Sequence, residues 1–388
     1  MKYRILFPIL ALIVLSACGT LGVEIEQPTS TAALVFATRV APAAATPALP
    51  LPTAPQVVSA TPAPQATAAA VATSLPAPAA GNTASPNPTP ASFIDDRSSA
   101  SQVIVSLFNA INRQEYARAY GYWTNPASTQ GSFAAYANGY QDTASVTLVF
   151  GQITGDAGAG QIYYSVPVIL KTTAKNGSLA NYAACYVVHQ AQPGNFGEPP
   201  FQPMSIDQGA AKRSDLNASD TSALTGACSD FPSGGNPVAV SGSNLNIDKN
   251  NFLDNRSGPL ETVSSLFNAL NLKQYVRAYS YFQTPATFPG PFDPYAAGYA
   301  ATESITASFG AVQSEGAAGS LYYKLPVVMQ VLNTSAATQT FAGCYTLRLA
   351  QPALQSTPPF QPLGITGANF NLVANGADVN SLLPTACN

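Results

Sequence analysis

The chain has 388 residues, of which 9% are charged, and its formal net charge is −3. Globular domains usually carry about 25% charged residues, so Ser, Thr, Asn, Gln and Gly must cover much of the exposed surface. The low content of Lys and Arg leaves no basic stripe that could displace the counterions of phosphates, which excludes nucleic acid as an expected partner.

The first residues have the features of a secretion signal. Lys2 and Arg4 precede an uncharged apolar run over residues 5–15, and small residues then lead to Cys18. This run is shorter than the roughly 20 residues that a helix needs to cross a bilayer. We therefore predict a signal peptide over residues 1–17.

The letters LSAC, which end at Cys18, resemble the lipobox of bacterial lipoproteins. The resemblance implies cleavage before Cys18, attachment of diacylglycerol and palmitate to Cys18, and anchoring at the outer face of the bacterial cell membrane or cell envelope. Each buried methylene of such chains contributes about 0.8 kcal/mol to membrane attachment. The alternative is an ordinary signal peptide with an incidental cysteine.

Residues 18–94 form the next segment. They are rich in Pro, Ala and Thr, and residues 40–94 contain no charge. Such a composition cannot build a core, and its prolines favour an extended polyproline conformation. We predict a disordered, semi-rigid tether.

The remainder of the chain contains a long internal repeat. "SLFNAINRQEYARAYGYW" begins at Ser106 and "SLFNALNLKQYVRAYSYF" at Ser265, an offset of 159, and other landmarks recur at the same offset. We predict two copies of one domain, over residues 95–228 and 254–388. Residues 229–253, rich in Gly, Pro, Ser and Asn, are the expected linker.

Each copy begins with a helical pattern. Apolar residues at the spacing i, i+3, i+4, i+7 predict a first helix: Ile104, Leu107, Phe108 and Ile111, then Val263, Leu266, Phe267 and Leu270. A short second helix is expected to end before Pro126 or Pro285. Residues 133–140 and 292–299 predict a third.

Alternating residues then predict strands near residues 145–150, 164–170 and 185–189 and at the matching positions of the second copy. The letters PPFQP, at Pro199 and Pro358, introduce a last strand. Antiparallel strands with one apolar face need a covering layer of helices. The predicted class is therefore α+β.

Helices followed by antiparallel strands, repeated as a unit of about 135 residues, resemble the nuclear-transport-factor-2-like cone, which ketosteroid isomerase and polyketide cyclases share. The resemblance implies two tandem cone-like domains. In each, N-terminal helices would pack on a curved antiparallel sheet.

Four cysteines fit this repeat. Cys185 and Cys228 are separated by 43 residues, as are Cys344 and Cys387. Outside the cytoplasm, one disulfide per copy is the simplest interpretation. It would tie a strand to the C-terminal tail of its domain and stabilise it by roughly 4 kcal/mol. A redox-active thiol would need a CxxC pair, which the sequence does not contain.

Catalytic residues are few. The one histidine, His189, is replaced by Arg348 in the second copy, so we expect a solvated surface residue. Asp95 and Asp96 are expected to cap the first helix ahead of Ser98. No cluster with metal-ligand spacing occurs. We therefore predict no metal and no cofactor.

Asp142 is the remaining candidate for catalysis. Enzymes of the cone family commonly place an Asp inside the cavity to move protons, which makes Asp142 a candidate general base. It aligns with Ala301 in the second copy. The alternative is a capping residue or one that faces water.

Aromatic residues are the candidates for a ligand pocket. Rings with a polar edge suit a wet apolar pocket, and they suit an ordinary core equally well. The sequence also leaves open whether Arg118 and Arg277 pin a helix to the sheet or lie at the rim. The candidates are Tyr116, Tyr120, Trp123, Tyr140, Tyr164 and Tyr186, with Tyr275, Tyr279, Phe282, Tyr299, Tyr323 and Tyr345 in the second copy.

The sequence thus predicts a cell-envelope lipoprotein that displays two non-catalytic ligand-binding or interaction domains. Its expected partners are the membrane, through the lipid on Cys18, and a neutral small molecule or an envelope protein. The alternatives are a small-molecule isomerase, dehydratase or hydrolase of the same fold, and an envelope spacer without a ligand.

Overall fold

The computed structural model describes residues 92–231, 235–242 and 245–388, which all belong to one structural unit. The predicted signal peptide, Cys18 and nearly all of the predicted tether lie outside the described residues. The structure is 25% helical and 37% strand, with two antiparallel sheets, which confirms the α+β class. No helix in the described ranges is long and apolar enough to cross a bilayer.

The helices of the first copy precede its sheet. They are α1 (Ala100–Asn112), α2 (Tyr116–Tyr120), α3 (Pro126–Thr129) and α4 (Phe133–Gly139). The expected capping by Asp95 and Asp96 is wrong: Ser99 is the N-cap of α1, because its hydroxyl accepts the N–H of Gln102 at 3.3 Å. Pro126 does not end α2. It occupies the first turn of α3, where its missing N–H costs nothing.

Six strands form the first sheet, in the order β5-β4-β3-β2-β6, with β1 also paired to β3. Strand β6 lies inside the predicted linker, 229–253, and pairs with β2. A short η1 (Pro193–Asn195) and α5 (Asp220–Leu224) flank β5. The strands are β1 (Thr143–Phe150), β2 (Ile153–Gly158), β3 (Gln161–Ala174), β4 (Leu179–Ala191), β5 (Ser205–Ser214) and β6 (Asn236–Val238).

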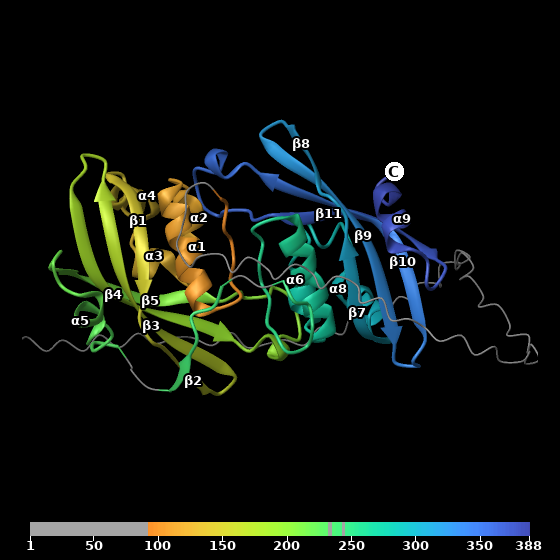
Figure 1. Ribbon diagram of the computed structural model, residues 1–388, viewed down its shortest axis with the longest axis horizontal. Helices are drawn as coiled ribbons and strands as arrows, with labels where there is room; N and C mark the ends of the chain where they lie inside the picture. Colours follow the sequence, from red (N-terminus) through yellow and green to blue (C-terminus); the bar gives the residue numbers. More distant parts are fainter. Residues whose placement is uncertain (1–91, 232–234, 243–244) are drawn as a thin grey trace, which may run out of the picture. The chain divides into compact units, whose positions relative to one another are not determined.

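The second copy repeats this plan (Figure 1). Its sheet has the order β11-β10-β9-β7, with β8 also paired to β9. Its helices are α6 (Pro259–Asn271), α7 (Tyr275–Tyr279), α8 (Phe292–Gly298) and α9 (Val379–Leu382), with η2 (Pro352–Leu354) and η3 (Leu383–Thr385). Its strands are β7 (Thr302–Phe309), β8 (Gln313–Ala317), β9 (Ser320–Asn333), β10 (Thr338–Ala350) and β11 (Gly364–Val373).

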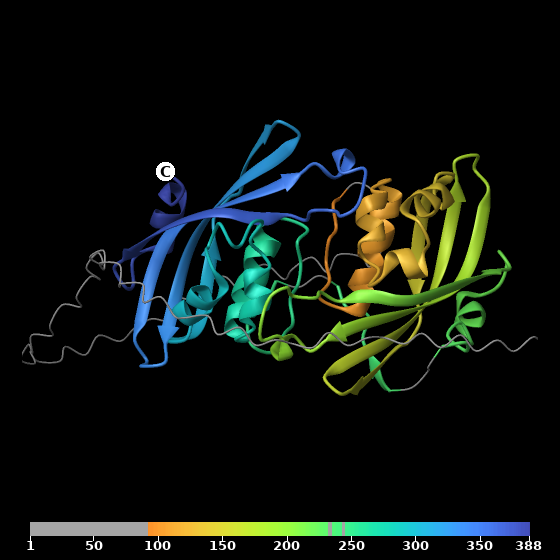
Figure 2. The same cartoon turned by 180° about the vertical axis from the view of Figure 1, so that it is seen from behind.

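Each copy has its own hydrophobic core between its long helix and its sheet. In both views α1 lies against the strands of the first sheet and α6 against those of the second (Figure 1, Figure 2). Leu107 and Phe108 of α1 are buried with Val166 and Val188 of the sheet. The predicted helical spacing therefore marks the buried stripe of the helix, as an amphipathic pattern should.

Two buried arginines hold the short helices in place. Arg118 donates to Glu115 of the α2 N-cap at 2.7 Å and to Asn109 of α1 at 2.9 Å. Its Nη1 also donates to the carbonyl of Ile94, ahead of α1. Arg277 makes the matching bonds to Gln274, Asn268 and Leu253. The open question about these arginines is thus decided: they tie helix to helix and to the preceding segment.

Both copies contain the expected type of disulfide. Cys185 of β4 is bonded to Cys228, and Cys344 of β10 is bonded to Cys387, each over a separation of 43 residues. Each bond ties a central strand to the segment that follows the last long strand of its sheet.

Candidate functional site

The candidate site is a pocket of about 380 Å³ in the second copy, between the helices and the sheet. Elements α6, α8, β7, β9 and β10 each contribute side chains to it. The lining is aromatic at Phe267, Tyr299, Phe341 and Tyr345, aliphatic at Leu270, Ile305, Met329 and Val331, and polar at Thr302, Asn333 and Gln339, with Gly298 and Ala301 beside them.

Strand register brings these side chains together. Met329 and Val331 of β9 are two residues apart, so both lie on one face of the sheet. Phe341 of β10 is paired with Met329, and Ile305 of β7 is paired with Val331. The sheet therefore presents two adjacent apolar rows to the pocket.

Tyr345 and Tyr299 supply hydroxyls to this apolar surface. Tyr345 is 5% exposed, and its ring meets Phe267 with centroids 6.0 Å apart. Burial raises the pKa of Tyr345 well above its ordinary value, and burial also raises the pKa of Tyr299. Both hydroxyls are therefore neutral at physiological pH and can donate or accept a hydrogen bond.

Among the described residues, no charged side chain lines the pocket. Such a site offers dispersion contacts and a few hydrogen bonds, and it offers nothing to balance the charge of an ionic ligand. Ligand sites that are mainly apolar with a few polar groups are typically about 300–1,000 Å³ in volume. Both its size and its chemistry suit a neutral molecule.

The first copy differs at the matching positions, 159 residues earlier. Tyr182 replaces Phe341, Thr172 replaces Val331, and Asp142 replaces Ala301. In the other direction, Ala174 and Ala180 replace Asn333 and Gln339, so the polar groups lie at different places in the two copies. The two copies therefore do not offer the same chemistry to a ligand.

The catalytic hypothesis for Asp142 does not agree with its position. Asp142 is exposed in the turn between α4 and β1, and its carbonyl accepts the N–H of Lys175 at 2.8 Å. A general base must lie within hydrogen-bond reach of the ligand inside the cavity. The exposed carboxyl of Asp142 does not meet that condition.

Most of the other predicted pocket aromatics are packing residues. Tyr120 and Tyr279 donate to the carbonyls of Gly131 and Gly290 at 2.7 and 2.6 Å. The cores bury Trp123, Tyr186 and Phe282. The hydroxyls of Tyr116 and Tyr275 donate to the carbonyls of Tyr140 and Tyr299. The half-buried rings of Tyr140 and Tyr323 pack against the two cores.

Two buried tyrosines are not among the residues predicted from the sequence. Tyr136 of α4 and Tyr295 of α8 are 5% and 8% exposed, and they stack edge-on against Tyr140 and Tyr299. Their i, i+4 spacing to those residues was the available signal. Tyr295 thereby holds the ring of Tyr299, which lines the pocket.

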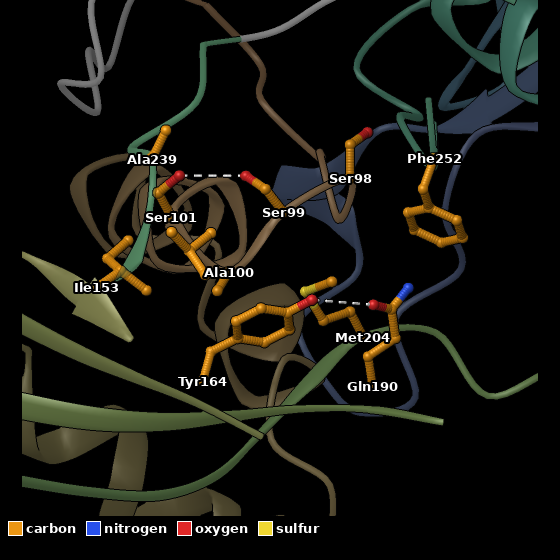
Figure 3. A pocket seen from close by; sticks show the side chains of 11 residues that line it. Ser98, Ser99, Ala100, Ser101, Ile153, Tyr164, Gln190, Met204, Ala239 and Phe252 are labelled. Carbon is orange, nitrogen blue, oxygen red and sulfur yellow. Dashed lines mark hydrogen bonds between the residues drawn. The ribbon is translucent and has the colours of Figure 1, made fainter. Parts of the chain in front are cut away.

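Tyr164 belongs to a different pocket, of about 220 Å³, at the N-terminus of α1 (Figure 3). Its hydroxyl donates to Gln190 Oε1 at 3.5 Å, and Met204 lies beside both residues. The hydroxyls of Ser99 and Ser101 are 3.1 Å apart on the opposite wall. The aromatic candidates of the first copy are thus spread over more than one site.

His189 lies half-buried on β4. Its ring stacks on Tyr163 at 4.7 Å, it bonds Gln161, and its Nδ1 is 3.8 Å from Asp207 Oδ1. In the part of the chain that the structure describes, no group of three or more His, Cys, Asp or Glu side chains could hold a metal ion.

No family model, curated protein or solved structure matches the chain.

Proposed function

We propose that the protein binds a neutral, mainly apolar small molecule in the pocket of its second copy and releases it unchanged. The observation that carries this proposal is the lining: aromatic and aliphatic side chains with neutral tyrosine hydroxyls and no charge. Apolar burial would drive binding, and Tyr299, Tyr345 and the amides of Asn333 and Gln339 would orient the ligand.

The cone family remains part of this proposal. Each copy has helices followed by a meandering antiparallel sheet, in the order that the family resemblance implies. The pocket lies between the helices and the sheet, where a cone would hold its ligand. The lipid anchor on Cys18 would then display the pocket at the cell envelope, and the intact mass of membrane-extracted protein tests that anchor.

The second candidate is an enzyme of the same fold. Proton transfer at neutral pH needs a group whose pKa lies near the working pH. None of the pocket's described lining residues has a carboxylate or an imidazole. Burial raises the pKa of Tyr345 and Tyr299, which moves it further above the working pH. This chemistry favours binding over turnover.

The fluorescence of phenylnaphthylamine, a neutral apolar probe, tests the proposal. We expect its emission to rise on binding. Ala301→Asp should weaken binding only severalfold, because position 301 lines the pocket but is exposed, so the new carboxylate keeps most of its solvation. Asp142 occupies the matching place in the first copy, so an Asp at position 301 should not prevent folding.

The matched control is Asp142→Ala, which removes the corresponding charge from the first copy and should leave probe binding unchanged. Met329→Trp fills the pocket and should abolish binding while the unliganded protein still unfolds cooperatively. If Ala301→Asp and Met329→Trp both bind the probe like the unaltered protein, the pocket is not the binding site and the proposal is wrong.

A further inference from the structure

A reciprocal bridge joins the two copies. Asp96 and Asn255, which are 159 residues apart, form an antiparallel bridge. The N–H of Arg97 donates to the carbonyl of Asp254 at 2.7 Å, and the N–H of Arg256 donates to that of Asp95 at 2.6 Å. Each bond is the repeat-equivalent of the other, so the junction has approximate two-fold symmetry.

Beside this bridge lies a pocket of about 270 Å³ that shares the symmetry. Asp95 and Arg118 also line it, both from the first copy. Its other lining residues come in pairs separated by 159 positions: Arg97 with Arg256, Gly121 with Ser280, Phe201 with Phe360 and Pro203 with Pro362. Two guanidinium groups and two phenyl rings therefore line one small pocket.

Arg97 is held in place but not neutralised. Its guanidinium stacks 4.4 Å from the centre of the Tyr122 ring and donates to the carbonyls of Met204 and Gly121 at 2.9 and 3.0 Å. It makes no ion pair within the described residues. A guanidinium has more N–H donors than these two bonds use.

Arg256 repeats the arrangement. Its guanidinium lies 4.5 Å from the centre of the Tyr281 ring, and its Nη2 donates to the carbonyl and the hydroxyl of Ser280, both at 3.0 Å. Its Nε is 4.0 Å from Asp254 Oδ1, which is too far for a hydrogen bond. Donors thus remain on this side of the pocket as well.

The neighbouring carboxylates of Asp95 and Asp254 are 5% and 2% exposed, so they are more deeply buried than the half-buried arginines. Asp95 accepts the Tyr122 hydroxyl at 2.8 Å, and Asp254 accepts the Tyr281 hydroxyl at 2.9 Å. Arg118 is paired with Glu115 at 2.6 Å. Two preorganised cations with spare donors are therefore the groups that an incoming ligand would meet.

We propose that this pocket binds a small oxyanion that carries an aromatic or apolar group, such as an aryl carboxylate or an aryl phosphate. The oxyanion accepts N–H donors of Arg97 and Arg256, for which the planar guanidinium is suited. The apolar group lies against Phe201 and Phe360, which are half-buried. This site differs in place and in charge from the neutral pocket of the second copy.

Calorimetric titration with benzoate, phenyl phosphate and the uncharged benzamide tests this proposal. We expect benzoate or phenyl phosphate to bind, benzamide to bind at least about tenfold more weakly, and added salt to weaken the oxyanion. The better of the two oxyanions identifies the head group. Arg97→Gln and Arg256→Gln should each weaken binding by about 10- to 100-fold, as expected for a lost charge-assisted hydrogen bond.

Arg213→Gln removes an exposed arginine of β5 and is the matched control, with binding expected to be unchanged. Phe201→Leu keeps both guanidiniums and removes only a ring that would contact the ligand. It should still weaken binding, although it changes no charge in the pocket. Melting temperatures without ligand verify that each variant folds.

Equal binding of benzamide, no binding of either oxyanion, or equal losses in Arg213→Gln and Arg97→Gln would overturn the proposal. Phenylnaphthylamine binding should be unaffected by benzoate, so this test is separate from that of the neutral pocket.

Discussion

The two copies bury an equivalent arginine against different partners. A buried arginine lies in the short second helix of each copy, at 2% exposure for Arg118 and 0% for Arg277. In the first copy its partner is the carboxylate of Glu115, and in the second it is the amide of Gln274. The two copies therefore allow a charged and a neutral partner to be compared, with the difference that Glu115 also contacts Arg113, which the second copy lacks.

Arg118→Gln should lower the free energy of unfolding by about 2–4 kcal/mol, because the buried Glu115 loses one of its two cations and keeps only Arg113, at 2.7 Å. Arg277→Gln should cost less, about 1–3 kcal/mol, because it leaves a neutral amide. Asp95 and Asp254 occupy matching places in the copies, so the difference reports on Glu115. Denaturant unfolding measures both values, and a larger loss for Arg277→Gln would contradict this account.

Residue-scale prediction from the sequence succeeded where a pattern was local. The helical stripe containing Leu107 and Phe108 is buried as expected. The roles of Tyr120 and Tyr345 could not be told apart, because the same residue type fills a core or lines a pocket according to its distant neighbours. The presence of Arg97 and Arg256 in one pocket could not be predicted either, because no local pattern shows that the two copies meet there.

At the scale of elements, the alternating strands were predictable and the short strands beside β3 and β9 were not. Strands β1, β3 and β4 have apolar residues on one face, as the alternation indicated. Strand β2, with the sequence ITGDAG, and β8, with QSEGA, lack that alternation. They form because the long strands β3 and β9 offer them a pairing edge, which is a tertiary effect that overrides local preference.

The disulfide of the second copy gives a prediction at this scale. The double variant Cys344→Ser, Cys387→Ser should lower the stability of the second copy by roughly 2–5 kcal/mol, because the unfolded chain regains the freedom of a long loop. Thermal unfolding under non-reducing conditions measures the loss. The first copy, with its own bond between Cys185 and Cys228, is the internal control. An unchanged melting curve would show that the bond does not constrain the fold.

At the scale of the molecule, the two copies of the repeat differ in the residues at matching pocket positions. The second copy has a pocket with no charged side chain among its described lining residues, and the junction brings Arg97 and Arg256 to one pocket. We propose that the neutral pocket of the second copy is the binding site.

Two methionines make that claim directly measurable. Besides Met1, the chain has only Met204 and Met329. Met329 lines the neutral pocket, whereas Met204 lines the pocket beside α1 in the first copy. Labelling the methionine methyl groups with carbon-13 therefore gives one NMR reporter for each site, and Met329→Leu assigns the signals. We predict that titration with phenylnaphthylamine shifts the Met329 signal and leaves the Met204 signal in place. A shift of Met204 alone, or of neither signal, would contradict the account.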